Sequence, residues 1–140
     1  MPGYLLDTCA WIDALLAPEK LRQSVRKIIA SKTPLHLCSV SLIEFARKEV
    51  RGDISISMPC AEWFERIALP KGKIILLDVS PPIAVDATRL PQPFVNRQGN
   101  VHKDPMDLII VATARHHDLT LLTSDQVLLD YPGVRTANTR

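Results

Sequence analysis

Short runs of consecutive apolar residues alternate along this chain with longer segments in which apolar residues recur every three or four positions. The short runs predict strands at 4–7, 35–38, 73–78, 120–123 and 134–136. The periodic segments, with their capping and stop residues, predict helices at about 8–16, 18–31, 39–52, 59–67, 80–90, 104–117 and 124–131. Strands that alternate with helices indicate an α/β three-layer fold with a mainly parallel sheet.

Two segments add detail to this fold. The run at 73–78 is continuously apolar, which is typical of a strand buried on both faces by covering helices. Residues 91–103 form the longest predicted loop, and a loop of this length in a small domain is more often functional than accidental. Neither repeats nor linkers interrupt the pattern, so we expect residues 1–140 to form one domain.

Composition narrows the protein class. Hydrophobic residues make up 46% of the chain and charged residues 23%, as in soluble globular proteins, and no apolar run approaches the roughly 20 residues that span a bilayer. The start of the chain lacks a basic segment and does not resemble a signal peptide, so we expect a cytoplasmic protein without membrane association. The three cysteines (Cys9, Cys38 and Cys60) show no zinc spacing and suggest buried, reduced thiols. A net charge of +2 permits an anionic partner without requiring one.

Four acidic residues occupy places that the predicted fold would bring together. Asp7 ends the first predicted strand, and Asp125 lies two residues past the fourth. The carboxyl ends of parallel strands share one edge of the sheet, where binding sites form. Glu44 interrupts an apolar stretch in the helix after the second strand. Asp107 lies at the head of the apolar face of the helix before the fourth strand.

A cluster of carboxylates has a chemical consequence. Buried carboxylates are costly unless they are paired with a cation, and neighbouring ones raise one another's pKa. A divalent metal removes this penalty, and all-oxygen ligation suits Mg²⁺ or Mn²⁺. Such an ion activates water and holds a phosphodiester during in-line attack. The four acids therefore favour metal-dependent phosphodiester hydrolysis.

Other chemistries lack their characteristic residues. The five glycines are isolated, so the chain contains neither a dinucleotide-binding motif nor a P-loop, and no serine lies in a GxSxG elbow. Cys9 stands where an aspartyl-phosphate hydrolase would carry a second acid. A non-catalytic, receiver-like binding domain remains an alternative, although Asp7-Thr8 supplies no acid pair and no lysine follows Lys103.

The segments that carry these acids resemble the PIN-domain ribonucleases and, among them, the VapC-type toxins of bacterial and archaeal toxin–antitoxin pairs. The matching segments are Tyr4–Thr8, Ser39–Glu44, His102–Ala114 and Leu121–Asp125, in this order along the chain. The resemblance implies a parallel five-stranded sheet between helices and Mg²⁺- or Mn²⁺-dependent cleavage of RNA. It also implies a homodimer and inhibition by a small cognate antitoxin protein.

By position, the resemblance assigns metal binding to Asp7, Glu44, Asp107 and Asp125. It places the hydroxyl groups of Thr8 and Thr123 close to the metal. Asp104 belongs to the same Asp-Pro-x-Asp segment as Asp107 and could take part through water, but we favour Asp107 because it directly precedes the apolar run. For contact with the RNA substrate, the long loop offers Arg97, His102 and Lys103.

Structural roles compete with these assignments. Asp104, Asp7 and Asp125 could each cap a helix, and Glu44 could pair with Arg47 or Lys48 on an exposed face. We expect Asp13, Asp78 and Asp86 to be surface acids, and at least two of Trp11, Trp63 and Phe64 to pack in the core. A PIN-type nuclease that acts in RNA processing, or on DNA, outside a toxin pair is a further alternative.

Overall fold

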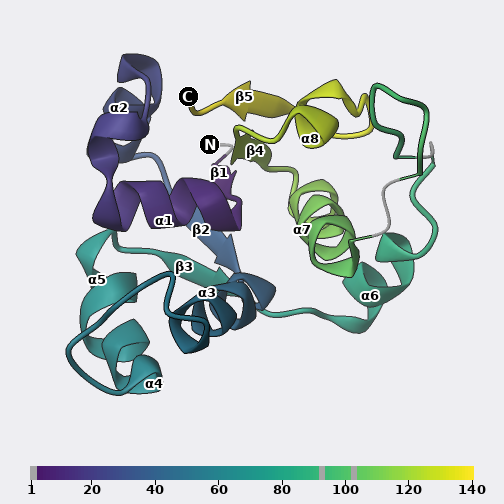
Figure 1. Ribbon diagram of the computed structural model, residues 1–140. Coiled ribbons are helices and arrows are strands. Elements are labelled where there is room, and N and C mark those ends of the chain that lie inside the picture. Colours follow the sequence, from purple (N-terminus) through teal and green to yellow (C-terminus); the bar gives the residue numbers. More distant parts are fainter. Residues whose placement is uncertain (1–2, 92–93, 102–103) are drawn as a thin grey trace.

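All the strands of the sheet run parallel, as the alternating pattern predicts. The computed structural model describes residues 3–91, 94–101 and 104–140 and contains a five-stranded sheet of order β3-β2-β1-β4-β5 (Figure 1). The strands are β1 (Tyr4–Leu6), β2 (Leu35–Cys38), β3 (Ile75–Leu77), β4 (Thr120–Thr123) and β5 (Thr136–Asn138). The predicted α/β fold with a parallel five-stranded sheet is confirmed.

Helices cover both faces of this sheet (Figure 1). One face is covered by α1 (Thr8–Leu16), the 3₁₀ turn η1 (Pro18–Lys20), α2 (Gln23–Ala30), α3 (Val40–Val50) and a helix formed by α4 (Cys60–Trp63), the π-helical turn η2 (Phe64–Ala68) and α5 (Leu69–Lys71). The other face is covered by α7 (Pro105–His116) and α8 (Gln126–Asp130), while α6 (Pro81–Ala87) packs on α7.

Alternate residues of the central strands supply two separate cores. Leu5 and Leu121 face α7 and α8, whereas Leu6 and Leu122 face α1 and α3, because successive strand side chains point to opposite faces. The second core holds an aromatic cluster with ring centroids 4.9 to 6.1 Å apart, made of Trp11, Phe45, Trp63 and Phe64. The two tryptophans and Phe64 are therefore core residues, in agreement with the sequence interpretation.

Three local predictions were wrong. The apolar run at 73–78 yields an edge strand and not a doubly covered one: Ile75 is 46% exposed and Leu76 is 37% exposed. A continuous apolar run does not reveal whether a neighbouring strand lies on each side. The helix predicted at 18–31 is divided into η1 and α2 by an extended residue, Leu21, whose side chain is buried in the core. Cys9 is exposed, whereas Cys38 is buried as expected.

The strand order indicates where on the sheet a binding site is expected. Connections from β1 lead outward through β2 to β3, and β4 leads to β5 on the other side, so the order reverses between the neighbours β1 and β4. Ligands of open α/β sheets bind beyond the carboxyl ends of the strands at such a reversal. In the described part of the chain, no helix has the length and apolar character to cross a membrane.

Candidate active site

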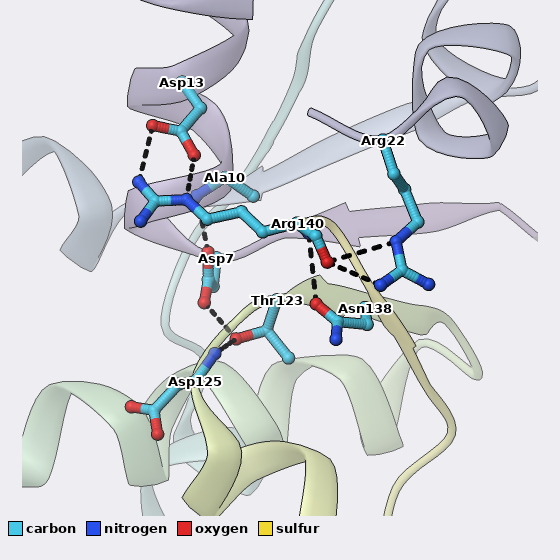
Figure 2. Close-up of polar contacts among 8 residues, drawn as sticks. All are labelled: Asp7, Ala10, Asp13, Arg22, Thr123, Asp125, Asn138 and Arg140. Carbon is cyan, nitrogen blue, oxygen red and sulfur yellow. Dashed lines mark hydrogen bonds and ion pairs between the residues drawn. The ribbon is translucent and has the colours of Figure 1, made fainter. Parts of the chain in front are cut away.

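Asp7 lies at the reversal point, directly after β1. It is the N-cap of α1, and only 5% of the residue is exposed. Its Oδ1 accepts a hydrogen bond from the Ala10 backbone N–H (2.7 Å), and its Oδ2 accepts one from the hydroxyl of Thr123 at the end of β4 (Figure 2). These two bonds fix the carboxylate between the start of a helix and the neighbouring strand.

The surroundings of Asp7 disfavour its charged form. Burial raises the pKa of Asp7 from 3.8 to about 6, against the lowering effect of the hydrogen bonds from Thr123 and Ala10. The negative charges of Asp107 and Asp125 raise this pKa further. Because these charges act on Asp7, the structure brings three of the four predicted acids into one neighbourhood. A cation bound among them would reverse the penalty.

Asp125 lies across from Asp7 and is linked to it through Thr123. Its backbone N–H donates to Thr123 Oγ1 (3.0 Å), while the Thr123 hydroxyl donates to Asp7 (Figure 2). The Asp125 carboxylate accepts from the Val127 N–H (2.9 Å) and caps α8. Both Asp7 and Asp125 thus cap helices, and the capping interpretation is confirmed for both.

Glu44 approaches the same edge from α3. The hydroxyl of Thr8, the residue after Asp7, is 2.6 Å from Glu44 Oε1 and 2.9 Å from Ser41 Oγ. Since a hydroxyl has one proton and a carboxylate only accepts, Thr8 donates to Glu44. Among the described residues, Glu44 makes no ion pair with the neighbouring basic residues of α3, so its carboxylate is oriented toward α1.

The two acids of the Asp-Pro-x-Asp segment differ in their surroundings. Asp104 is exposed and caps α7, accepting from the Met106 N–H at 3.0 Å, as expected for an N-cap before a proline. Asp107 is half-buried in the first turn of α7, and its charge acts on Asp7. Asp107 is therefore near enough for its charge to act on Asp7, whereas Asp104 caps α7.

Of the residues predicted for substrate contact, the structure describes Arg97, which does not lie with the acids. Arg97 is exposed, and its Nε lies 3.3 Å from a carboxylate oxygen of Asp130. Asp130 ends α8, and Asp125 caps its start, so Arg97 lies at the opposite end of that helix. His102 and Lys103 fall outside the described residues. Contact of these three side chains with RNA stays a prediction.

Sequence reasoning missed an ion pair beside this site. Asp13 was expected at the surface, but it is only 4% exposed, and it binds the guanidinium of Arg140 through both carboxylate oxygens (Figure 2). The surface interpretation of Asp13 is wrong because its partner lies 127 residues away in the sequence. No local pattern around either residue signals this pairing.

The acids have the donor chemistry of a site for a hard cation. Within residues 3–91, 94–101 and 104–140, no three Asp, Glu, His or Cys side chains are placed so that together they could hold a metal ion. Carboxylate oxygens of Asp7, Glu44 and Asp125 instead accept the hydrogen bonds described above. Carboxylates and hydroxyls are the ligands that Mg²⁺ and Mn²⁺ prefer. Each of these oxygens accepts one hydrogen bond and keeps a second lone pair, so the bonds can persist while the side chains move closer around a shared ion.

Replacing Asp7 should stabilise the protein in the presence of a chelator. A raised pKa means that ionisation of Asp7 opposes folding, so this residue's contribution to the free energy of unfolding falls as the pH rises from about 4 to about 6. Asp7→Asn should therefore raise the free energy of unfolding at pH 7.5 by roughly 1–3 kcal/mol, with no gain at pH 4, as measured by urea denaturation. A variant less stable than wild type at both pH values would contradict this assignment.

Comparison with known proteins agrees with this fold. Ribonuclease VapC22 of Mycobacterium tuberculosis is 27% identical over 130 residues, which are 91% of each chain. The solved structure of VapBC2 from Rickettsia felis, bound to a DNA fragment from their promoter, matches with a TM-score of 0.69 and 16% identity over 98% of both chains. A toxin–antitoxin complex from Klebsiella pneumoniae matches with a TM-score of 0.65 and 22% identity over 94% of this chain and 95% of that chain.

At these identities, the structural matches establish a shared fold. The sequence model of the PIN domain family extends over residues 4–134, from the strand before Asp7 to the turn beyond Asp125. The acids described above all lie inside the matched region, and the chain belongs to the PIN domain family.

Proposed function

We propose that this PIN-domain protein is a divalent-metal-dependent endoribonuclease and the toxin of a toxin–antitoxin pair. The observation that carries the proposal is the link that Thr123 makes between buried Asp7 and Asp125 at the reversal point of the sheet. Burial and the charges of Asp107 and Asp125 raise the pKa of Asp7 there. Such a concentration of carboxylates has a stability cost that a bound cation offsets. The similarity to ribonuclease VapC22, whose length this chain covers almost completely, supports the reaction class.

The proposed metal ligands are Asp7, Glu44, Asp107 and Asp125, with Mg²⁺ or Mn²⁺ as the ion. When bound, such an ion activates water and neutralises charge on the phosphodiester. The chain's own residues preorganise this site. Thr123 holds Asp7 in one orientation and also binds the backbone of Asp125, so one hydroxyl sets the relative position of two ligands. The Thr8 hydroxyl likewise holds the Glu44 carboxylate in one orientation.

The remaining predicted residues complete the proposal. Asp104 would contribute through a water molecule, and Arg97, His102 and Lys103 would contact RNA phosphates. The partners are a small antitoxin and a second copy of the chain, with residues 1–140 acting as one domain. The solved toxin–antitoxin complexes that share this fold support such a partner. On α3, Ile43 is 49% exposed and Val50 is 82% exposed, which offers apolar surface for protein contact.

Cleavage of a mixed RNA pool by purified, partner-free protein tests this function. We expect cleavage with added Mg²⁺ or Mn²⁺ and none with chelator, and a loss of at least about 100-fold in Asp7→Asn and Asp107→Asn. Asp53→Asn is the matched control, since Asp53 lies far from β1 in the sequence and its exposed carboxylate pairs with Arg51. Folded Asp107→Asn with undiminished metal-dependent cleavage would disprove the site assignment.

Removal of the Thr123 hydroxyl should weaken catalysis without disturbing the fold. Thr123→Val keeps the shape of the side chain but loses both bonds that link Asp7 to Asp125, so we expect cleavage to slow by roughly 10–100-fold. Thr120→Val is the control, because Thr120 begins the same strand at its opposite end. Equal rates for the two variants, measured under saturating metal, would show that the hydroxyl does not organise the site.

A further inference from the structure

The segment after β5 brings a basic side chain to the edge where the acids lie. β5 runs parallel to β4, and the Thr139 N–H donates to the Thr123 carbonyl at 3.0 Å. The chain therefore emerges from the sheet beside Asp7 and Asp125. Arg22 holds it there: the Arg22 N–H donates to the Thr139 carbonyl (2.8 Å), and the Arg22 guanidinium donates to the main-chain oxygen of Arg140 (Figure 2).

Asp13 fixes the Arg140 guanidinium from one side. Arg140 Nε donates to Asp13 Oδ2 and Nη2 donates to Oδ1, both at 3.0 Å, which is a bidentate pair. The Asp13 side chain is only 5% exposed, whereas that of Arg140 is 49% exposed. A buried carboxylate thus holds a half-exposed guanidinium in a defined orientation.

The pairing with Asp13 leaves one edge of the guanidinium available. A guanidinium has five N–H groups, and Asp13 accepts from one on Nε and one on Nη2. The two on Nη1 and the second on Nη2 have no acceptor among the residues that the structure describes. This outer Nη1/Nη2 edge has the fork geometry that binds two oxygens of one phosphate.

The positive charge of Arg140 also acts within the field of the acid cluster. The hydrogen bonds and the charge of Asp13 raise the pKa of Arg140, and the charge of Asp7 raises it further. Figure 2 shows the Arg140 side chain reaching toward α1, the helix that Asp7 caps. A phosphate held by this side chain would lie near the carboxylates that are proposed to bind the metal.

We infer that Arg140 binds a backbone phosphate of the RNA next to the bond that is cleaved, and that Asp13 is its positioning residue. The inference rests on the proposed nuclease function. A purely structural role, in which Arg140 only neutralises Asp13 and anchors the chain, accounts for the inner edge of the guanidinium. A structural role leaves the outer edge unused, and it predicts that replacing Arg140 does not change the number of phosphate contacts with RNA.

The salt dependence of RNA affinity measures the number of phosphate contacts. We would measure the dissociation constant of a fluorescent, mixed-sequence single-stranded RNA over a range of salt concentrations, with Asp107→Asn as the cleavage-deficient background. Each phosphate contact contributes about 0.7 to the slope of log affinity against log salt. Adding Arg140→Gln should lower the magnitude of the slope by about 0.7 and weaken low-salt binding about tenfold.

A matched control and a second comparison make the test specific. Arg135→Gln removes an arginine that pairs with exposed Asp118 before β5, and it should leave the slope unchanged. Arg140→Gln alone leaves the buried Asp13 carboxylate without its partner, which can destabilise the protein. We would therefore also compare Asp13→Asn with Asp13→Asn/Arg140→Gln, a pair in which only the arginine differs, and expect the same loss of slope.

The outcomes separate this inference from the proposed function. Unchanged slopes on loss of Arg140 in both backgrounds, or an equal decrease in Arg135→Gln, would overturn the phosphate contact while RNA binding itself persists. If neither the Asp107→Asn protein nor wild type in chelator binds RNA, the proposed function fails and the inference fails with it. In cleavage-competent protein, Arg140→Gln should raise KM more than it lowers kcat.

Discussion

The hydrogen bond from the Thr123 hydroxyl to Asp7 connects the ends of the neighbouring strands β1 and β4. The two bonded residues lie 116 positions apart in the sequence. Much of the candidate site depends on this connection. Asp7 is buried, so its orientation is set by the few donors that reach it, namely Thr123 and the first turn of α1. Because Thr123 also binds the backbone of Asp125, the same hydroxyl relates the two acids to each other.

This arrangement combines local stabilisation with a global cost. Capping of α1 and α8 by Asp7 and Asp125 satisfies backbone donors that would otherwise lack partners. Burial, with a further contribution from the charges of Asp107 and Asp125, raises the pKa of Asp7 to about 6, so the ionised Asp7 opposes folding near neutral pH. Functional sites commonly hold groups in surroundings that a structural role alone would not favour. The two cores on either side of the sheet supply the packing that maintains this strained electrostatic arrangement.

The sequence predicts the parts of this site that depend on local pattern. Asp7 and Asp125 are recognisable because each follows a short apolar run, and parallel strands place such residues at one edge. Asp107 is recognisable because it begins the apolar face of α7. The exposure of β3 was not predictable, since strand order depends on contacts between distant segments. The pairing of Asp13 with Arg140 was hidden for the same reason, and it changes the interpretation of Asp13 from surface acid to support for a basic side chain.

The central claim is that carboxylates from α1, α3, α7 and the end of β4 converge on one divalent ion. Anomalous diffraction from crystals soaked in Mn²⁺ tests it most directly, because the scattering locates the ion independently of any activity. The account predicts one strong peak within coordination distance of Asp7 and of at least two of Glu44, Asp107 and Asp125, and its loss in Asp7→Asn crystals. A fully occupied Mn²⁺ peak elsewhere, with none at these carboxylates, would contradict it.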